Sequence, residues 1–320
     1  MRHASTRRRW LTALGAGGLL LALSACSGAA DSQTSEGPGP TVTVQHAQGT
    51  ATIEGIPEKI VVFDLGVLTT LDDLGVDGVV GVPEVASMPK NLTKYAGDEY
   101  TKVGSLKEPD YEQVNELAPD LILVAGRSAP AYGELSKIAT TVDLTVDSER
   151  FLDSAKERVV TLGKLFGKQS QARQRLDALT TKAAEVAAAQ PATGKRGLVV
   201  LTTGGKMSAY GPGSRFGIVY DALGVQPAVP NLSAETHGDA ISAEFIADAN
   251  PDVLYVIDRD SAIGEQGQAA RQLLDNQLVN GTNAAKNGKI VYLDPATWYL
   301  ASNGLSSLEA MVDEIGASLK

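Results

Sequence analysis

Two stretches of the chain decide the fold: EQVNELAPDLILVAGR at residues 112–127 and EFIADANPDVLYVIDR at residues 244–259. Both follow the pattern E-x6-P-D-x6-R, and they begin 132 residues apart. Each carries an apolar, β-rich run between the Pro-Asp pair and the arginine. Because four fixed positions and both runs stay in register, we interpret the stretches as copies of one α/β unit.

Each copy predicts a helix that ends at the residue before proline, followed by a turn and a buried strand. The arginine stands just beyond the carboxyl end of that strand, at the edge where open α/β sheets bind ligands. We therefore expect Arg127 and Arg259 to occupy comparable positions and to face one cleft between two lobes.

Short β-rich runs alternate with helical stretches on both sides of the repeat, which is typical of α/β layering. The expected strands are 41–45, 60–63, 78–82, 121–124, 198–202, 253–257 and 290–293. Between the halves, residues 151–190 have apolar positions at helical spacing, and Gly167 divides them into two helices. The second helix would be about 33 Å long and would connect the lobes, and Pro191 and Gly194 are expected to end it.

The length of 320 residues favours two domains, and the net charge of −10 argues against a general affinity for nucleic acid. The single cysteine excludes a disulfide framework within the chain and a multi-cysteine metal cluster, and three histidines leave little material for a polyhistidine metal site.

The amino terminus predicts an exported lipoprotein. A basic start precedes the short apolar run 11–25, which is typical of a signal peptide and too short for a membrane span. The run ends Leu23-Ser24-Ala25-Cys26, the pattern processed in bacterial lipoproteins, so we expect Cys26 to carry the lipid. The arginines at 7–9 leave open whether export uses the twin-arginine route.

The protein is therefore expected at the cell membrane, lipid-anchored on the extracytoplasmic side. Residues 27–40 are rich in Gly, Ser and Pro and lack large apolar side chains, which predicts a flexible tether. The predicted limits are 1–25 for the signal peptide, 26–40 for the lipidated tether, 41–166 for the N-terminal lobe, 167–193 for the connecting helix and 194–320 for the C-terminal lobe.

Three further residues are candidates for ligand binding. Arg215 lies in the glycine-rich turn 211–217, where the backbone can approach a ligand before a helix begins near Ile218. Together with the two repeat arginines it would suit an anion with several oxygens. His237, in a polar loop, and Tyr299, after the last strand, carry donors that suit ferric iron, although a solvated histidine and a core aromatic are ordinary alternatives. The bulky neighbour Trp298 could redirect the phenol of Tyr299.

Glu112 and Glu244 begin the two repeat stretches and lie on the helix before the cleft strand, so we expect them on the outer rim. A symmetric pair of carboxylates could form salt bridges to two basic sites on a symmetric partner, although a surface glutamate is often only solvated.

Enzyme signatures are mostly missing from the sequence. It has no G-x-S-x-G or H-E-x-x-H motif, and the turn at 204–206 lacks the first glycine of a P-loop because Val200 takes that position. We predict that the protein is not an enzyme. A surface hydrolase that uses His237 and Asp239 as a base is the alternative from another functional class.

The lipobox, the duplicated lobes, the connecting helix and the repeated pattern together resemble the substrate-binding lipoproteins of bacterial ABC transporters for ferric siderophores and cobalamin. The resemblance covers residues 41–320. Five motifs look like the catecholate-siderophore subgroup: GRSAPAY at 126–132, GPGSRFG at 211–217, THGD at 236–239, IDRD at 257–260 and WYLASNG at 298–304.

This resemblance implies two Rossmann-like lobes joined by a long connecting α-helix, the class III periplasmic-binding-protein fold. It also implies roles for the candidate residues: an arginine cage of Arg127, Arg215 and Arg259, iron coordination by His237 and Tyr299, and permease docking by Glu112 and Glu244.

The function implied is capture of a ferric catecholate siderophore and its delivery to an ABC permease with its ATPase. Fe(III) would enter as part of the ligand, with no permanently bound cofactor, and the protein would be a monomer that binds no nucleic acid. A hydroxamate siderophore, haem or a corrinoid remain alternative ligands. Two histidines beyond the signal peptide disfavour a manganese or zinc carrier.

Overall fold

The computed structural model describes residues 41–265 and 269–320, with the backbone alone at 191–193. The predicted signal peptide, the tether and the lipidation site Cys26 lie outside the described residues. Within the described part, no helix combines the length and apolar character that crossing a membrane requires.

The first lobe is built on a sheet of five parallel strands in the order β5-β4-β3-β6-β7. The strands are β3 (Ile60–Val62), β4 (Val79–Val82), β5 (Thr101–Lys102), β6 (Leu121–Val124) and β7 (Thr141–Asp143). An antiparallel hairpin, β1 (Thr41–His46) with β2 (Gly49–Glu54), precedes them. Because β3 and β6 are buried on both faces, their sequences are apolar throughout.

Helices and short turns cover this sheet. They are α1 (Leu65–Asp73), η1 (Lys90–Ala96), α2 (Tyr111–Leu117), η2 (Ala129–Ala131), α3 (Tyr132–Leu135), η3 (Ser148–Arg150) and α4 (Phe151–Leu165).

The second lobe has a mixed sheet of six strands in the order β11-β9-β8-β12-β13, with β10 paired to β8. The strands are β8 (Arg196–Thr203), β9 (Lys206–Tyr210), β10 (Gln226–Pro227), β11 (Asp239–Ile241), β12 (Val253–Asp258) and β13 (Ile290–Tyr292). Strands β9 and β11 are antiparallel to their neighbours. The helices are α6 (Ile218–Asp221), α7 (Ala243–Ala249), α8 (Arg259–Ile263), α9 (Ala270–Leu274), α10 (Gln277–Asn280), α11 (Asn283–Lys286), η4 (Ala296–Leu300) and α12 (Leu305–Ser318).

The sequence repeat is a structural repeat. Helices α2 and α7 both end in a left-handed residue before proline, Ala118 with φ 44° and Asn250 with φ 39°. The aspartate after each proline then accepts a hydrogen bond from a backbone N–H at the start of the neighbouring strand. Asp120 accepts from the N–H of Lys59 at 2.9 Å, and Asp252 accepts from the N–H of Arg196 at 3.0 Å. Each Pro-Asp pair thus fixes the buried strand beside its neighbour.

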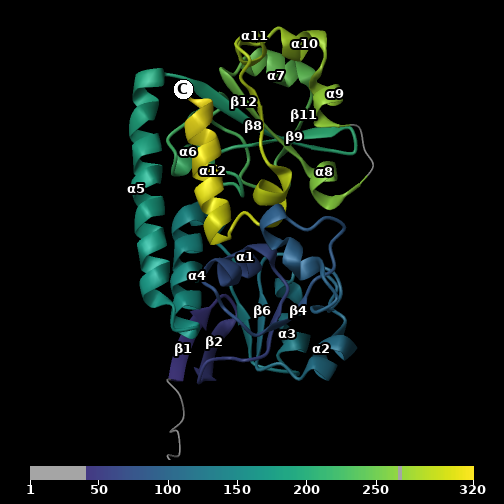
Figure 1. Ribbon diagram of the computed structural model, residues 1–320. Helices are drawn as coiled ribbons and strands as arrows, with labels where there is room; N and C mark the ends of the chain where they lie inside the picture. Colours follow the sequence, from purple (N-terminus) through teal and green to yellow (C-terminus); the bar gives the residue numbers. More distant parts are fainter. Residues whose placement is uncertain (1–40, 266–268) are drawn as a thin grey trace, which may run out of the picture. The chain divides into compact units, whose positions relative to one another are not determined.

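Two helices connect the lobes. The predicted connecting helix is α5 (Gln169–Thr193), which lies alongside α4 and α12 (Figure 1). Of the two residues expected to end this helix, Pro191 lies inside it, and Gly194, with a φ of 59°, closes it as predicted. Helix α12 returns from the second lobe and packs against α1 of the first, a connection that the sequence did not predict.

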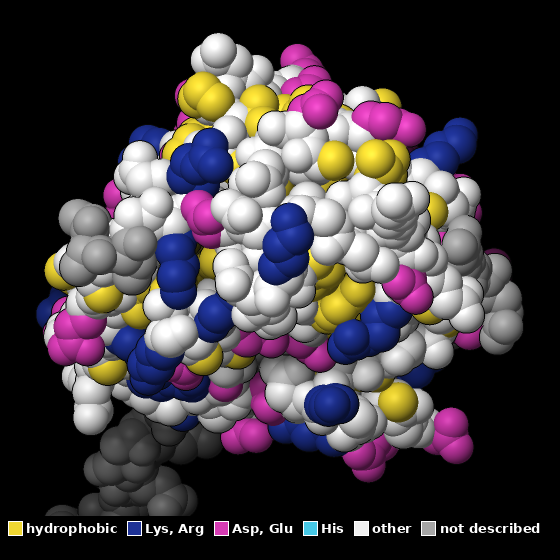
Figure 2. Space-filling model, turned by 90° about the horizontal axis from the view of Figure 1, so that it is seen from above, with side chains coloured by type: hydrophobic (Ala, Val, Ile, Leu, Met, Phe, Trp, Pro, Cys, Tyr) yellow, Lys and Arg dark blue, Asp and Glu magenta, His cyan; other side chains and the backbone are white. Residues whose placement is uncertain are grey.

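Each predicted strand is present, with ends that differ by at most two residues. The two lobes and the connecting helix confirm the fold class, while the exact lobe limits stay a prediction. On the face shown in Figure 2, basic and acidic side chains are interspersed and apolar side chains form only small groups. Large apolar side chains exposed in the described part of the chain are Ile56, Tyr111 and Leu278.

Candidate functional site

The arginines of the two repeat copies reach one point between the lobes. Arg127 follows β6 after a turn at Gly126, whose φ is 47°, and its Nη2 donates to the carbonyl oxygen of Tyr299 at 2.6 Å. Arg259 is the first residue of α8, directly after β12, and its Nε donates to the phenol oxygen of Tyr299 at 3.0 Å. Tyr299 therefore joins the two strand ends.

The glycine-rich turn brings in Arg215. The hydroxyl of Ser214 donates to the carbonyl of Gly211 at 2.6 Å, and Gly213, with φ 72°, donates its N–H to Asp221 at 2.7 Å. These bonds hold the turn so that Nη2 of Arg215 donates to the same Tyr299 carbonyl at 3.2 Å. Helix α6 begins at Ile218, as predicted.

Tyr299 is the centre of this arginine cluster, by which we mean Arg127, Arg215, Arg259 and Tyr299. It lies in η4, a π-helical turn of a kind frequent at functional sites. The three guanidinium carbons lie 4.9, 4.8 and 5.8 Å from the centroid of its ring, within the range of cation–π attraction.

The surrounding charge changes the acidity of the phenol. Burial raises the pKa of Tyr299, but the hydrogen bond from Arg259 and the positive charges of Arg127, Arg259 and Arg215 outweigh it, so the pKa lies below its ordinary value of 10.0. The phenolate, which is the form that binds a hard cation, therefore forms more readily than in a free tyrosine.

Trp298 does not displace the phenol. Its ring is fully buried, and its Nε1 donates to Glu314 of α12 at 2.5 Å. Adjacent residues of the π-helical turn thus take opposite roles, with Trp298 in the core and Tyr299 in the cluster.

Two cavities adjoin the cluster, and Arg127 lines both. The larger, of about 400 Å³, is bordered by Asp64, Thr145, Asn303 and Arg215. The smaller, of about 240 Å³, is bordered by Glu84, Lys107, Arg259 and Tyr299. A ligand with two or more anionic groups could therefore contact the guanidiniums from both sides.

The cluster has an excess of positive charge. Within the described ranges, neither Arg127 nor Arg215 forms an ion pair with a carboxylate, whereas Nη1 of Arg259 lies 3.5 Å from both Asp260 and Glu265. Burial lowers the pKa of Arg215, and the like charge of Arg127 lowers it further. An oxygen-rich anion would relieve this repulsion.

Asp64 and Asn303 belong to the site although the sequence argument missed them. Asp64 caps α1 by accepting from the N–H of Val67 at 2.9 Å, and it accepts from Nδ2 of Asn303 at 3.1 Å. Burial raises its pKa against the effect of these bonds and of Arg127. Its place after the strand β3, at the edge that carries Arg127, could have revealed it. The place of Asn303 beside Asp64 could not be predicted in this way, because it depends on the packing of α12 against α1 of the first lobe.

Among the described residues, no hydrogen bond joins His237 to Tyr299. His237 is exposed on the loop between β10 and β11, and its neighbour Thr236 lines the larger cavity. In the part of the chain that is described, no group of three or more His, Cys, Asp and Glu side chains could hold a metal ion.

Glu112 and Glu244 lie away from the cluster, in the first turns of α2 and α7, and both are exposed. Asp110 caps the first helix and Ser242 the second. A hydrogen bond with the Ser242 side chain lowers the pKa of Glu244, so this carboxylate stays ionised at neutral pH.

Comparison with known proteins agrees with this geometry. The family model described as periplasmic binding protein matches residues 60–297. The petrobactin-binding protein YclQ of Bacillus subtilis is 43% identical over 93% of this chain and 95% of its own length. Its crystal structure has a TM-score of 0.84 and covers 88% of this chain and 99% of that chain.

Two further relatives are similar over most of their length. The ferric-anguibactin-binding protein FatB of Vibrio anguillarum is 34% identical over 86% of both chains. The structure of the periplasmic catecholate-siderophore binding protein VctP from Vibrio cholerae is 34% identical, with a TM-score of 0.83, and covers 87% of this chain and all of that one.

Proposed function

We propose that this chain, which belongs to the periplasmic binding protein family, captures a ferric catecholate siderophore and delivers it to an ABC transporter for iron uptake. The family consists of substrate-binding proteins, so the chain is not an enzyme, and the hydrolase alternative is removed. Its relatives are extracytoplasmic proteins, and some are named lipoproteins.

The observation that carries the proposal is the arginine cluster. Ferric catecholates are anionic complexes of planar catecholate rings, and their metal-bound oxygens accept charge-assisted hydrogen bonds. Arg127 and Arg215 now share one carbonyl acceptor, the backbone oxygen of Tyr299, and neither has a carboxylate partner among the described residues. A catecholate oxygen would supply the negative charge that this carbonyl lacks.

Tyr299 and His237 would complete the coordination of iron when the chelator supplies only four oxygens. The lowered pKa of Tyr299 favours phenolate binding to ferric iron. His237 would have to move with its loop, which carries Thr236 at the rim of the larger cavity. The iron belongs to the cargo, and the protein would hold no cofactor of its own.

Three parts of the proposal concern the setting of the protein. Cys26 would carry the lipid anchor, and Glu112 and Glu244 would dock one lobe each on the permease. The protein would act as a monomer, because one copy offers both carboxylates.

A hydroxamate siderophore, haem or a corrinoid is the alternative ligand. The excess positive charge favours an anionic catecholate over a neutral ferric hydroxamate. Arg259, paired with Asp260 and Glu265, is the cluster arginine whose charge is already partly balanced.

The test uses Trp298, the only tryptophan after the signal peptide, which lies beside the proposed iron ligand. Ferric bis-catecholate, tris-catecholate and hydroxamate complexes are titrated, and fluorescence quenching and the visible charge-transfer band are followed. We expect saturable quenching by both catecholates and a band shift on the bis-catecholate that disappears in Tyr299→Phe. A response to the hydroxamate alone, or to no complex, would refute the catecholate assignment.

A further inference from the structure

Helix α12 begins without a cap of its own. Its N-cap residue is Gly304, which has no side chain to accept from the first N–H groups of the helix. A Cβ at this position would lie 2.7 Å from the Cβ of Thr69 in α1, so a serine or aspartate cap would not fit. The contact between the lobes therefore excludes the usual solution.

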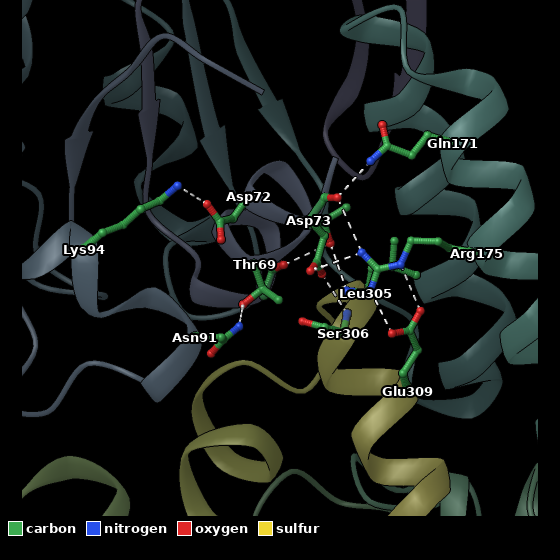
Figure 3. Close-up of polar contacts among 12 residues, drawn as sticks. Thr69, Asp72, Asp73, Asn91, Lys94, Gln171, Arg175, Leu305, Ser306 and Glu309 are labelled. Carbon is green, nitrogen blue, oxygen red and sulfur yellow. Dashed lines mark hydrogen bonds and ion pairs between the residues drawn. The ribbon is translucent and has the colours of Figure 1, made fainter. Parts of the chain in front are cut away.

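Helix α1 of the other lobe supplies the missing acceptors (Figure 3). The N–H of Leu305 donates to Oγ1 of Thr70 at 3.1 Å, and the N–H of Ser306 donates to Oδ2 of Asp73 at 2.8 Å. The carboxylate of Asp73 also places negative charge at the positive end of the α12 dipole. One lobe thus caps a helix whose sequence belongs to the other.

Arg175 of α5 secures this cap (Figure 3). Its Nε and Nη2 form a bidentate pair with Glu309 of α12, at 3.0 and 2.7 Å, while Nη1 lies 3.1 Å from Oδ1 of Asp73. The guanidinium therefore ties the cap residue to the next turn of α12, in a setting where all three side chains are about a third exposed or less.

The capped segment is short and leads directly to the ligand site. Only four residues separate Tyr299 from Gly304, and within them Asn303 donates to Asp64 of the first lobe. Trp298 is held on α12 by Glu314. Tyr299 is thus attached through its chain neighbours to α12, which α1 and Arg175 hold in place.

We propose that Thr70, Asp73 and Arg175 are positioning residues that hold Tyr299 in the arginine cluster by fixing the start of α12. The inference rests on the proposed function for its ligand readout. Replacing Arg175 would leave the cluster arginines on their strands and turn but would release the segment that carries the phenol of Tyr299.

The test compares Arg175→Met with Lys182→Met. Lys182 also joins α5 to α12, through Asp313, but among the described residues it forms no salt bridge with α1. We expect Arg175→Met to weaken binding of a ferric bis-catecholate about tenfold and of a tris-catecholate, whose iron needs no phenolate, less than about threefold. The Lys182→Met protein should bind both complexes within about twofold of the unchanged protein.

A double-mutant cycle with Tyr299→Phe then separates positioning from general loosening. If Arg175 acts through Tyr299, Arg175→Met has no further effect on bis-catecholate affinity in the Tyr299→Phe background. An equal loss in both backgrounds, or an equal effect of Lys182→Met, would overturn the proposal. Thr70→Val keeps the shape of the side chain and removes the acceptor for the N–H of Leu305. It takes the place of Arg175→Met if that variant does not fold, and we expect a smaller loss of bis-catecholate affinity that Tyr299→Phe again cancels.

Amide hydrogen exchange on the unliganded protein tests the inference independently of the ligand. In Arg175→Met and Thr70→Val, exchange across residues 296–306 should accelerate about tenfold, with Lys182→Met unchanged. Failure of every protein to bind catecholates, with this acceleration present, would refute the proposed function and leave the positioning role standing. Unchanged exchange would refute the positioning role.

Discussion

The two copies of the repeat share a backbone device and differ in how they hold their arginine. In both, a left-handed residue and a Pro-Asp pair set a buried strand against its neighbour. Arg127 then has the Tyr299 carbonyl as its hydrogen-bond acceptor, whereas Arg259 contacts Thr203, Asp260, Glu265 and the Tyr299 phenol.

A second difference lies on the neighbouring strand. Val62 of β3 pairs with Leu123, and Val199 of β8 pairs with the equivalent Tyr255. Two residues further on, the first lobe has Asp64 and the second has Leu201. Duplication therefore fixed where each of these two arginines stands, while the surrounding residues set its charge balance. Arg127 forms no ion pair among the described residues, whereas Arg259 is paired with Asp260 and Glu265.

The largest expected effect concerns the surface that we propose docks on the permease. Replacing both Glu112 and Glu244 by alanine should abolish iron uptake by cells that depend on this protein, because each lobe then loses its anionic contact. Single replacements should retain part of the uptake. The affinity for a ferric catecholate, measured on the purified double variant, should not change. Normal uptake by the double variant would refute the docking role.

The next effect separates Arg259 from the other two arginines of the cluster, Arg127 and Arg215. Alanine at Arg127 or Arg215 should weaken ferric catecholate binding about a hundredfold, the loss of a charge-assisted hydrogen bond in a partly buried site. Alanine at Arg259 should cost only about tenfold, because Asp260 and Glu265 already balance its charge. Fluorescence titration gives the affinities, and far-UV circular dichroism confirms that the fold persists. Unchanged affinity in all three variants would contradict the cage assignment.

The sequence predicted the parts of this fold that depend on local pattern. Buried strands read as apolar runs, and the repeat placed Arg127 and Arg259 at matching strand ends. The glycine-rich turn 211–217 and the helix after it followed from local backbone requirements. Tyr299 was identified by resemblance, and the structure shows why its neighbour Trp298 is no obstacle: it is buried against Glu314.

What the sequence could not show depends on contacts between distant residues. Gly304 by itself does not indicate a helix start, because it has no side chain to act as a cap. The side chains that cap α12 lie more than 200 residues earlier, at Thr70 and Asp73. Asn303 enters the site for the same reason. The end of α5 is a local matter: of the two residues expected to end it, Gly194 does so, while Pro191 lies inside the helix.

A smaller effect tests the charge imbalance in the absence of ligand. Arg215→Met should raise the free energy of unfolding by about 1 kcal/mol, because it removes a half-buried guanidinium that Arg127 repels and that has no carboxylate partner in the described residues. Arg259→Met should lower it by a similar amount, since it breaks bonds to Thr203 and Tyr299. Urea denaturation of the unliganded proteins measures both, and a loss of stability in Arg215→Met would contradict the comparison.

The smallest effect concerns Asp64, the carboxyl that the second lobe replaces with Leu201. Burial raises the pKa of Asp64 above its ordinary value of 3.8, so the folded protein favours the protonated form. The contribution of this group to stability is therefore greatest at low pH and is lost as the pH rises through the folded pKa. Asp64→Asn keeps both acceptor bonds, to Val67 and Asn303, and removes the charge.

We therefore expect Asp64→Asn to raise the free energy of unfolding at pH 7 by on the order of 1 kcal/mol, and to have no effect near pH 3, where the carboxyl is protonated in both states. Asp110→Asn, at the exposed cap of α2, controls for the same exchange at a helix start. A gain that persists at pH 3, or an equal gain in the control, would show that the difference between the lobes lies in packing, because only a charge effect disappears on protonation.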